Sequence, residues 1–356
     1  MLKRLTRRLS GTTVVMWLIG LAILAVVLGG SILTLGSGKY GPQEWLDLTI
    51  NGLALGSIYA LIALGYTLVY GILRMINFAH GDIFMAGPFA AYFVATAFDN
   101  ADYFGGDPLL EIVALVIVLI FAMVVSTVIA VLLERIAYRP LRRAPRLIPL
   151  ITAIGASFFL EYAFRGLFGS GIKSYPEVII LSGKWNILGI PILKIRVVVI
   201  AAAILMLIGL AFFVQRTKVG KAMQAVSEDK DTAALMGINV DRIIVLTFVV
   251  GGALAGAAGV LYALMFRQVT FIMGFMPGLK AFTAAVVGGI GNITGAALGG
   301  LFLGIAESLF PNLVLDGLGI PAPYQLRDAL AFVLLVLVLI FRPTGILGER
   351  LATKKA

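Results

Sequence analysis

The feature that most constrains this chain is a series of apolar runs, each about as long as a helix that crosses a lipid bilayer. Apolar residues make up 60% of the 356 residues and charged residues 13%, and the mean hydropathy is +1.04. A bilayer admits only helices or closed barrels, because every backbone polar group inside it must be hydrogen bonded. Barrel strands would alternate in polarity, and these runs do not. The sequence therefore predicts an all-α integral membrane protein, a polytopic helical bundle.

The runs predict about eight full spans, since roughly 20 apolar residues cross the hydrocarbon core as a helix. The first run follows a basic N-terminus, as in a signal peptide, but no small-residue cleavage site follows it. We therefore expect an uncleaved first span. The full spans are expected near residues 12–35, 45–73, 83–98, 112–134, 148–168, 193–214, 243–266 and 329–341.

A ninth apolar stretch, residues 281–310, predicts a broken pair of half-helices. Irregular backbone at membrane depth is tolerated where it lines a protein cavity. We expect the two halves to meet at the break, with free backbone groups facing such a cavity. The residues that interrupt the stretch are Gly288, Gly289, Gly291 and Asn292.

Basic residues predict the orientation, because Lys and Arg collect on the cytoplasmic side of a membrane. With the N-terminus inside and the spans alternating, the inner segments hold 19 of the 28 Lys and Arg residues. Residues 99–111 fall outside, with four acidic residues and no basic one. This alternation of sides places the C-terminus inside only if residues 281–310 enter the membrane and return to the same side. Both termini are thus expected in the cytoplasm, and the inner segments are 1–11, 73–81, 135–147, 215–242 and 342–356.

Small residues four positions apart form stripes that let helix backbones approach closely. One stripe is Gly52, Gly56 and Ala60, and another is Gly300, Gly304 and Ser308. Each predicts a helix–helix interface, and together the stripes favour a compact bundle.

A long charged segment, residues 215–242, separates two apolar runs. It holds five basic and four acidic residues. A solvated linker would have such a composition, but a linker need not encode a capped helix with an apolar end. We interpret this segment as the place where a soluble partner contacts the protein and moves the spans on either side.

The middle of this segment predicts one short helix. Ser227 is expected to accept from the first free N–H groups, and Glu228 and Asp229 lie where the positive helix end favours anions. Gly237 is expected to end the helix in the left-handed conformation. The predicted contact surface consists of Ser227, Glu228, Asp229, Ala233, Ala234, Leu235, Met236 and Gly237.

A polar elbow, residues 74–82, joins two spans on the predicted inner side. Asn77, His80 and Asp82 could cap the helix ends around a tight turn, or they could form a functional contact. The sequence alone leaves both possibilities open.

Several classes of function are disfavoured by composition. The chain has no cysteine and one histidine, so thiolate chemistry and His-rich metal clusters are absent. No Gly-Lys pair is followed by Ser or Thr, so the nucleotide-binding loop is missing. A net charge of +10 could suggest nucleic acid, but the basic residues lie beside span ends. A serine nucleophile at Ser157 would need a base, and the only histidine, His80, is expected about half a membrane away. We therefore expect no catalytic residue. We also expect no metal and no bound cofactor.

Five ordered blocks resemble one known family, the permease subunits of branched-chain amino-acid ABC importers of the LivH type. The resemblance covers about residues 45–348. The blocks are NGLALGSIYALIALGYTLVYGILRMINFAHGDIFMAG (51–87), ERIAYRPLRRAPRLIPLITAIGASFFLE (134–161), MQAVSEDKDTAALMGINVDRIIVLTFVVGGALAGAAGVL (223–261), GLKAFTAAVVGGIGNITGAALGGLFLGIAES (278–308) and RPTGILG (342–348).

The resemblance implies a multi-pass protein of the bacterial cytoplasmic (inner) membrane with the ABC importer permease fold. It implies a second permease subunit, either a LivM-like relative or a second copy. It also implies two cytoplasmic ATPase subunits that bind ATP and Mg²⁺, and an extracytoplasmic binding protein. Residues 215–242 would match the ATPase-coupling segment of the family. Ala233, Ala234 and Gly237 echo its pattern, although the glycine spacing is one residue short.

The predicted organisation has three parts: residues 1–44 with an extra first span, the permease domain 45–348, and a tail, 349–356. The function implied is ATP-driven uptake of branched-chain or other hydrophobic amino acids. Relatives carry urea or short amides, so a urea/amide permease stays open. So does a stand-alone secondary carrier built around the broken helix, and, third, a membrane enzyme.

Overall fold

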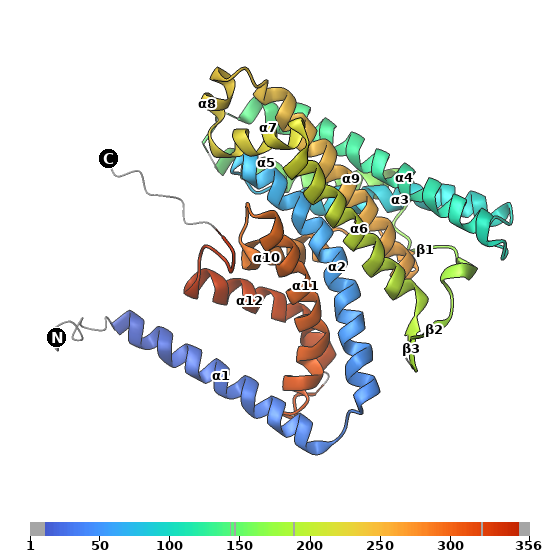
Figure 1. Cartoon of the computed structure of the whole chain (residues 1–356), viewed down its shortest axis with the longest axis vertical. Coiled ribbons are helices and arrows are strands. Elements are labelled where there is room, and N and C mark those ends of the chain that lie inside the picture. The colour runs from blue at the N-terminus through green and yellow to red at the C-terminus, as the bar shows by residue number, and fades with distance from the viewer. Residues whose placement is uncertain (1–10, 143, 146, 188, 322, 349–356) are drawn as a thin grey trace.

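The computed structural model describes residues 11–142, 144–145, 147–187, 189–321 and 323–348, and it is a helical bundle (Figure 1). Within these residues, nine helices are long and apolar enough to cross a membrane. The predicted all-α membrane fold is therefore confirmed. The long helices are α1 (Gly11–Ser37), α2 (Pro42–Leu73), α3 (His80–Asn100), α4 (Pro108–Leu133), α5 (Leu147–Phe168), α6 (Lys194–Arg216), α9 (Val240–Phe266), α11 (Ile293–Phe310) and α12 (Arg327–Phe341).

Shorter elements connect these spans. Two small antiparallel sheets lie beyond the ends of the spans: β1 (Lys173–Ser174) pairs with β4 (Gln268–Val269), and β2 (Lys184–Ile187) with β3 (Ile190–Leu193). A π-helical turn, Glu134–Tyr138, extends α4, and another, Pro311–Leu315, extends α11. The short helices are α7 (Lys218–Glu228), α8 (Lys230–Leu235) and α10 (Phe275–Gly288).

Helix α2 is the centre of the bundle, and it packs along α11 through the two predicted stripes of small residues. A Cβ on Gly304 would lie 2.2 Å from the backbone nitrogen of Gly56. A Cβ on Gly300 would lie 2.4 Å from the Cα of Ala60. Only glycine allows backbones this close, which explains why a 32-residue helix is buried along most of its length.

A second close interface joins α9 to α3 and α4. Gly252 and Gly256 of α9 face the backbone of α4, and Gly259 faces Phe84 and Pro88 of α3. A Cβ on Gly259 would lie 2.4 Å from the carbonyl oxygen of Phe84. The core of the bundle is therefore made by α2, α3, α9 and α11.

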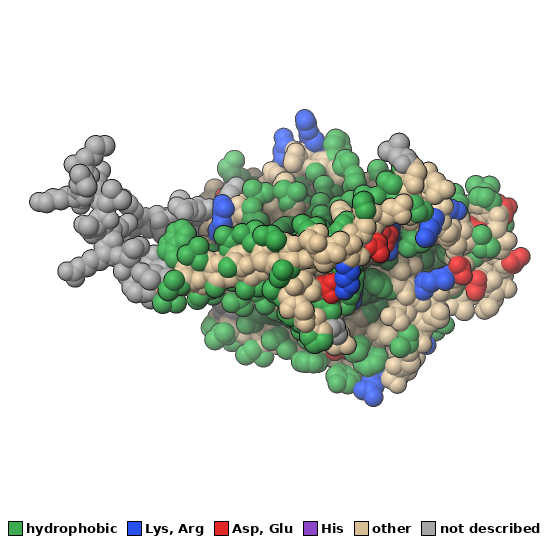
Figure 2. Space-filling model, turned by 90° about the horizontal axis from the view of Figure 1, so that it is seen from below, with side chains coloured by type: hydrophobic (Ala, Val, Ile, Leu, Met, Phe, Trp, Pro, Cys, Tyr) green, Lys and Arg blue, Asp and Glu red, His purple; other side chains and the backbone are tan. Residues whose placement is uncertain are grey.

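Helix α1 stands apart from this core (Figure 1). Its packing concentrates at its C-terminal end, where a Cβ on Gly317 would lie 2.1 Å from the Gly30 carbonyl oxygen. Lys39, just beyond the helix, pairs with Asp316 at 2.8 Å. That hydrogen bond holds the pKa of Asp316 below its ordinary value. Viewed from below, the surface is mostly apolar, and charged side chains stand in separate groups, several of them at the right-hand end, the side on which α3, α4 and β1 lie in Figure 1 (Figure 2). The basic residues before Gly11 lie outside the described part.

The broken pair differs from prediction in the length of its second helix. Helix α10 is short, but α11 with its π-helical turn runs from Ile293 to Leu315, long enough to span. The expectation of two half-helices is thus wrong for the second. The pair still starts and ends on one side: β4 precedes α10, and the Ser308 hydroxyl near the end of α11 donates to Leu48 O near the start of α2 at 2.7 Å.

Candidate functional site

The predicted coupling segment folds into two short helices rather than one. Helix α7 buries Gly220, Met223 and Val226, residues three apart that form one apolar stripe against the bundle. A Cβ on Gly220 would lie 2.3 Å from the Phe213 carbonyl oxygen, so α7 sits tightly against the end of α6. Helix α8 then projects at the end of the molecule (Figure 1).

The expected cap at Ser227 is wrong. Ser227 and Glu228 lie in the last turn of α7, and the Ser227 hydroxyl donates to the carbonyl oxygen of Gln224 at 2.7 Å. Asp229 caps α8 instead: its Oδ1 accepts from the backbone N–H groups of Asp231 at 2.9 Å and Thr232 at 3.1 Å. A carboxylate in this position satisfies two free donors at once and adds favourable charge at the helix start.

The end of α8 agrees with prediction. Gly237 has φ +83°, and its N–H and that of Ile238 donate to the carbonyl oxygens of Ala234 and Ala233. This is the paired hydrogen bonding by which a left-handed glycine closes a helix.

Helix α8 presents an apolar tip. Leu235 and Met236 are 88% and 79% exposed, Ala234 is exposed, and Ala233 is buried against the bundle. Partial burial lowers the pKa of Lys230 at the start of α8, and the neighbouring Arg142 and Arg74 lower it further. The tip is an apolar anchor within a polar rim, the composition of a small binding hot spot.

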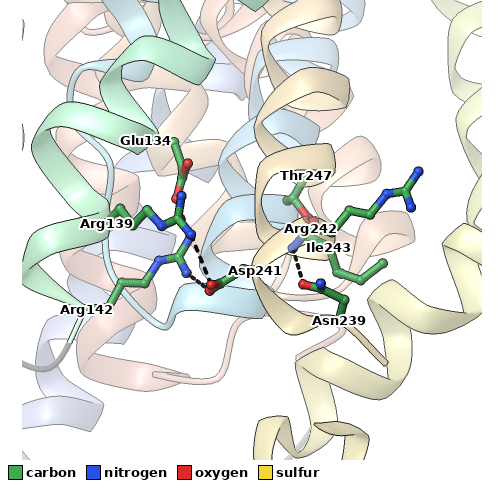
Figure 3. A network of polar contacts seen from close by, with 8 residues as sticks. All are labelled: Glu134, Arg139, Arg142, Asn239, Asp241, Arg242, Ile243 and Thr247. Atoms are coloured by element: carbon green, nitrogen blue, oxygen red, sulfur yellow. Dashed lines mark hydrogen bonds and ion pairs between the residues drawn. The ribbon is translucent and has the colours of Figure 1, made fainter. Parts of the chain in front are cut away.

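Ionic contacts hold the base of this segment (Figure 3). Arg142 pairs with both Glu134 and Asp241, and Arg139 reaches Asp241 at 3.2 Å. Asn239 caps α9 by accepting from the Arg242 N–H at 3.0 Å. The loop after α4 and the first turn of α9 are therefore tied together beside α7 and α8. Arg74 adds a further link, donating to the Ser227 carbonyl oxygen at 3.0 Å.

The elbow at residues 74–82 enters the bundle instead of capping helix ends. The N-cap of α3 is Ala79, with no side-chain hydrogen bond, so the capping possibility is wrong. His80 is buried in the notch left by Gly65: a Cβ on Gly65 would lie 2.2 Å from His80 Nε2. Asn77 is buried as well, and its Oδ1 accepts from the Tyr138 hydroxyl at 2.5 Å. Both side chains thus fix the elbow between helices.

Asp82, the third elbow residue, lies on a cavity of about 230 Å³. The carboxyl group is 1% exposed, and its Oδ2 accepts from the Ser157 hydroxyl at 2.5 Å. Glu161, one turn after Ser157 on α5, lies beside Asp82. Arg165, one turn further along α5, lies over the rings of Tyr162 and Phe271. The cavity walls include Tyr66, Phe78, Phe158 and Phe275.

The break between α10 and α11 is closed by hydrogen bonds, so the expectation of free backbone groups facing a cavity there is wrong. The N–H groups of Ile346 and Leu347 donate to the carbonyl oxygens of Val287 and Gly288 at 2.8 and 2.9 Å. Asn292 caps α11 through Gly295 N and donates to Leu347 O. The turn between the helices has left-handed glycines at Gly289 and Gly291.

The comparisons with known proteins agree with this architecture. Residues 48–339 match the family described as branched-chain amino acid transport system / permease component. The chain belongs to this family of permeases.

Two relatives match over nearly their whole lengths, and a third matches over less than half of its length. The permease protein BraD of the high-affinity branched-chain amino acid transport system of Pseudomonas aeruginosa is 43% identical over 311 residues, 86% of this chain and 96% of BraD. LivH of Escherichia coli K12 is 41% identical over 310 residues, 86% of this chain and 96% of LivH. A probable LivM permease of Methanocaldococcus jannaschii is 31% identical over 146 residues, 38% of this chain and 41% of LivM.

The permease also contains a buried ionic cluster that the sequence reasoning missed. Lys280 of α10 pairs with Glu307 of α11 and Asp328 of α12, both at 2.6 Å, and Lys280 and Glu307 are almost wholly buried. Unpaired charges inside a bilayer are costly, so the cluster holds the short α10 between its neighbours. The sequence contained a signal for this cluster, because Lys280 lies beside an apolar stretch and a charge there needs an acidic partner.

Proposed function

We propose that this chain is the membrane subunit of an ATP-driven importer of branched-chain or other hydrophobic amino acids, in the bacterial cytoplasmic membrane. The observation that carries the proposal is the match to BraD and LivH over 96% of each relative. The chain would form part of the translocation path, with both termini in the cytoplasm.

Energy would come from two separate cytoplasmic ATPase subunits that bind ATP and Mg²⁺. The exposed apolar tip of α8 supports this, because Leu235 and Met236 have no cover in the described part of the chain. A second permease, related or identical, and an extracytoplasmic binding protein would complete the importer. Apolar side chains exposed on α5, such as Ile151 and Phe159, offer surface for lipid or for the second permease.

The test is reconstitution in liposomes of the chain with its candidate permease, ATPase and binding-protein partners. Leucine uptake that requires ATP and all the partners is the expected result. Uptake by the chain alone with an ion gradient would identify a secondary carrier instead. Uptake of urea or acetamide, with leucine excluded, would identify an amide permease.

A further inference from the structure

The cavity beside Asp82 lies near the middle of the bundle. Ser157, on its wall, is the eleventh residue of the 22-residue helix α5. Ionisable side chains at this depth are expensive, and they generally mark substrate or ion pathways. The volume of about 230 Å³ is below that of drug-sized pockets and suits a molecule the size of one amino acid.

One end of the cavity is acidic and lacks a donor. Asp82 Oδ2 accepts from Ser157, but Oδ1 is buried and receives no hydrogen bond from the described residues. The neighbouring group is the carboxyl of Glu161, another acceptor when ionised. Two neighbouring carboxylates in a low-dielectric site are both ionised only when a cation lies beside them. A ligand ammonium group would supply the missing donors.

The start of α10 instead favours a negatively charged group. Gly274 precedes this 14-residue helix and makes no side-chain cap, and both Gly274 and Phe275 line the cavity. A helix N-terminus of this kind carries partial positive charge that suits a carboxylate. It approaches Asp82 closely, because a Cβ on Gly81 would lie 2.6 Å from the Gly274 carbonyl oxygen and one on Gly278 2.9 Å from the Gly81 Cα.

We propose that this cavity is a transit site for a zwitterionic amino acid. Its α-ammonium binds Asp82 with Glu161 beside it, its carboxylate faces the first turn of α10, and its apolar side chain lies against Phe78 and Phe158. The proposal rests on the proposed transport function and adds where the substrate passes and which of its groups are recognised. Removing the Asp82 charge should therefore weaken binding about tenfold or more, as expected for loss of a hydrogen bond to a charged group.

The experiment uses the cysteine-free chain in its reconstituted complex without binding protein, so that the cavity alone selects the ligand. Ile154 lines the cavity, and Ile154→Cys can be labelled with a small maleimide. Millimolar leucine should slow this labelling. The amine 3-methylbutylamine and the acid 4-methylpentanoate each lack one charged group of leucine and should protect much less. A cysteine at Ile117, on the exposed surface of α4, should show no protection by any of the three.

Variants then identify the recognising group. Asp82→Asn should remove protection by leucine and, once the binding protein is restored, reduce uptake at low leucine about tenfold or more, while Asp82→Glu should keep part of both. Asp316→Asn, the same change at the exposed end of the bundle, should leave both intact. Protection by leucine that is unchanged in Asp82→Asn, or equal protection by the three ligands, overturns the proposal. The labelling of the unaltered cavity does not depend on whether Asp82→Asn folds.

The two proposals fail differently. A complete complex, with its binding protein, that takes up no leucine refutes the proposed function. A complex that takes up leucine normally, while leucine gives no protection of Ile154→Cys, refutes the transit site alone.

Discussion

Replacing Gly237 with valine tests the backbone conformation of residues 215–242 separately from their side-chain contacts. The residue has φ +83°, and a Cβ placed on it would have no neighbouring atom within 4 Å. Valine therefore meets no steric clash from the chain, and its whole cost is conformational. A left-handed backbone costs an ordinary L-residue about 1–2 kcal/mol, and a β-branched residue resists it most.

That cost falls on a helix of only six residues. About 1.4 kcal/mol corresponds to a tenfold change in an equilibrium constant. Gly237→Val should therefore reduce the population with an intact α8 end by about tenfold, while membrane insertion is unchanged. Gly237→Asn is the matched control, since asparagine tolerates the left-handed region.

The assay is ATP hydrolysis stimulated by substrate and binding protein in liposomes, together with the amount of ATPase retained by the complex. Stimulation should fall in Gly237→Val and stay near normal in Gly237→Asn. Normal stimulation and retention in Gly237→Val, and likewise in Leu235→Asp, would refute the reasoning, and the segment would be a linker. Equal loss in both Gly237 variants would mean that the partner needs the empty space at Gly237, not the backbone conformation.

Three further predictions follow from other parts of the chain. Ser227→Cys should be inaccessible to an external reagent in intact cells and Asp102→Cys accessible; the reverse pattern would overturn the proposed orientation. Gly304→Val should cost about 1–3 kcal/mol or more and lower the thermal stability of the protein in detergent, because its Cβ meets Gly56, whereas Gly36→Val, with open space around it, should not. Hydrogen bonds from Arg267 and Ser182 hold the pKa of Glu177 below its ordinary value of 4.5. This contact should therefore stabilise the segment between α5 and α6 above that pH and lose its effect as pH falls through the lowered pKa. Glu177→Gln should abolish this pH dependence in hydrogen-exchange protection factors, and an unchanged dependence would contradict the prediction.

The spans and their main interface could be predicted from the sequence because each rests on a local or periodic signal. A long apolar run has its lowest free energy as a helix that spans the bilayer. The stripes of α2 and α11 each predicted a close helix contact without naming the partner helix, and the structure brings Gly56 and Gly304 together. Gly237 was likewise predictable, because few residues besides glycine adopt its backbone conformation readily.

The cap of α8 was missed because two candidate residues stand two positions apart. Ser227 and Asp229 both suit a helix start. The packing of α7 decides which of the two residues caps α8. The apolar stripe of α7, which ends at Val226, packs on the bundle and places Ser227 in the last turn of α7. Tertiary packing therefore overrides a local capping preference, and only the stripe of α7 hinted at it.

The elbow could not be interpreted from its own sequence, since its partners lie far along the chain. Asn77 meets Tyr138, and Asp82 meets Ser157, residues 61 and 75 positions away. Polar residues between two spans suggest a surface turn unless long-range contacts are known. Only the fold reveals that the elbow is buried.

The elbow joins the two candidate sites through a short, constrained path. Arg74 at one end donates to the last turn of α7, and Asp82 at the other end lines the central cavity. Between them, Asn77 is bonded to Tyr138 in the π-helical turn, whose first residue, Glu134, belongs to the ionic network that anchors α9. Because packed elements move as units rather than deform continuously, we expect a displacement of residues 215–242 to act on the start of α3 through residues 74–82. The polar residues of the elbow are thus placed where an external contact and the cavity can influence each other, which explains why so many buried polar groups occupy one short connection.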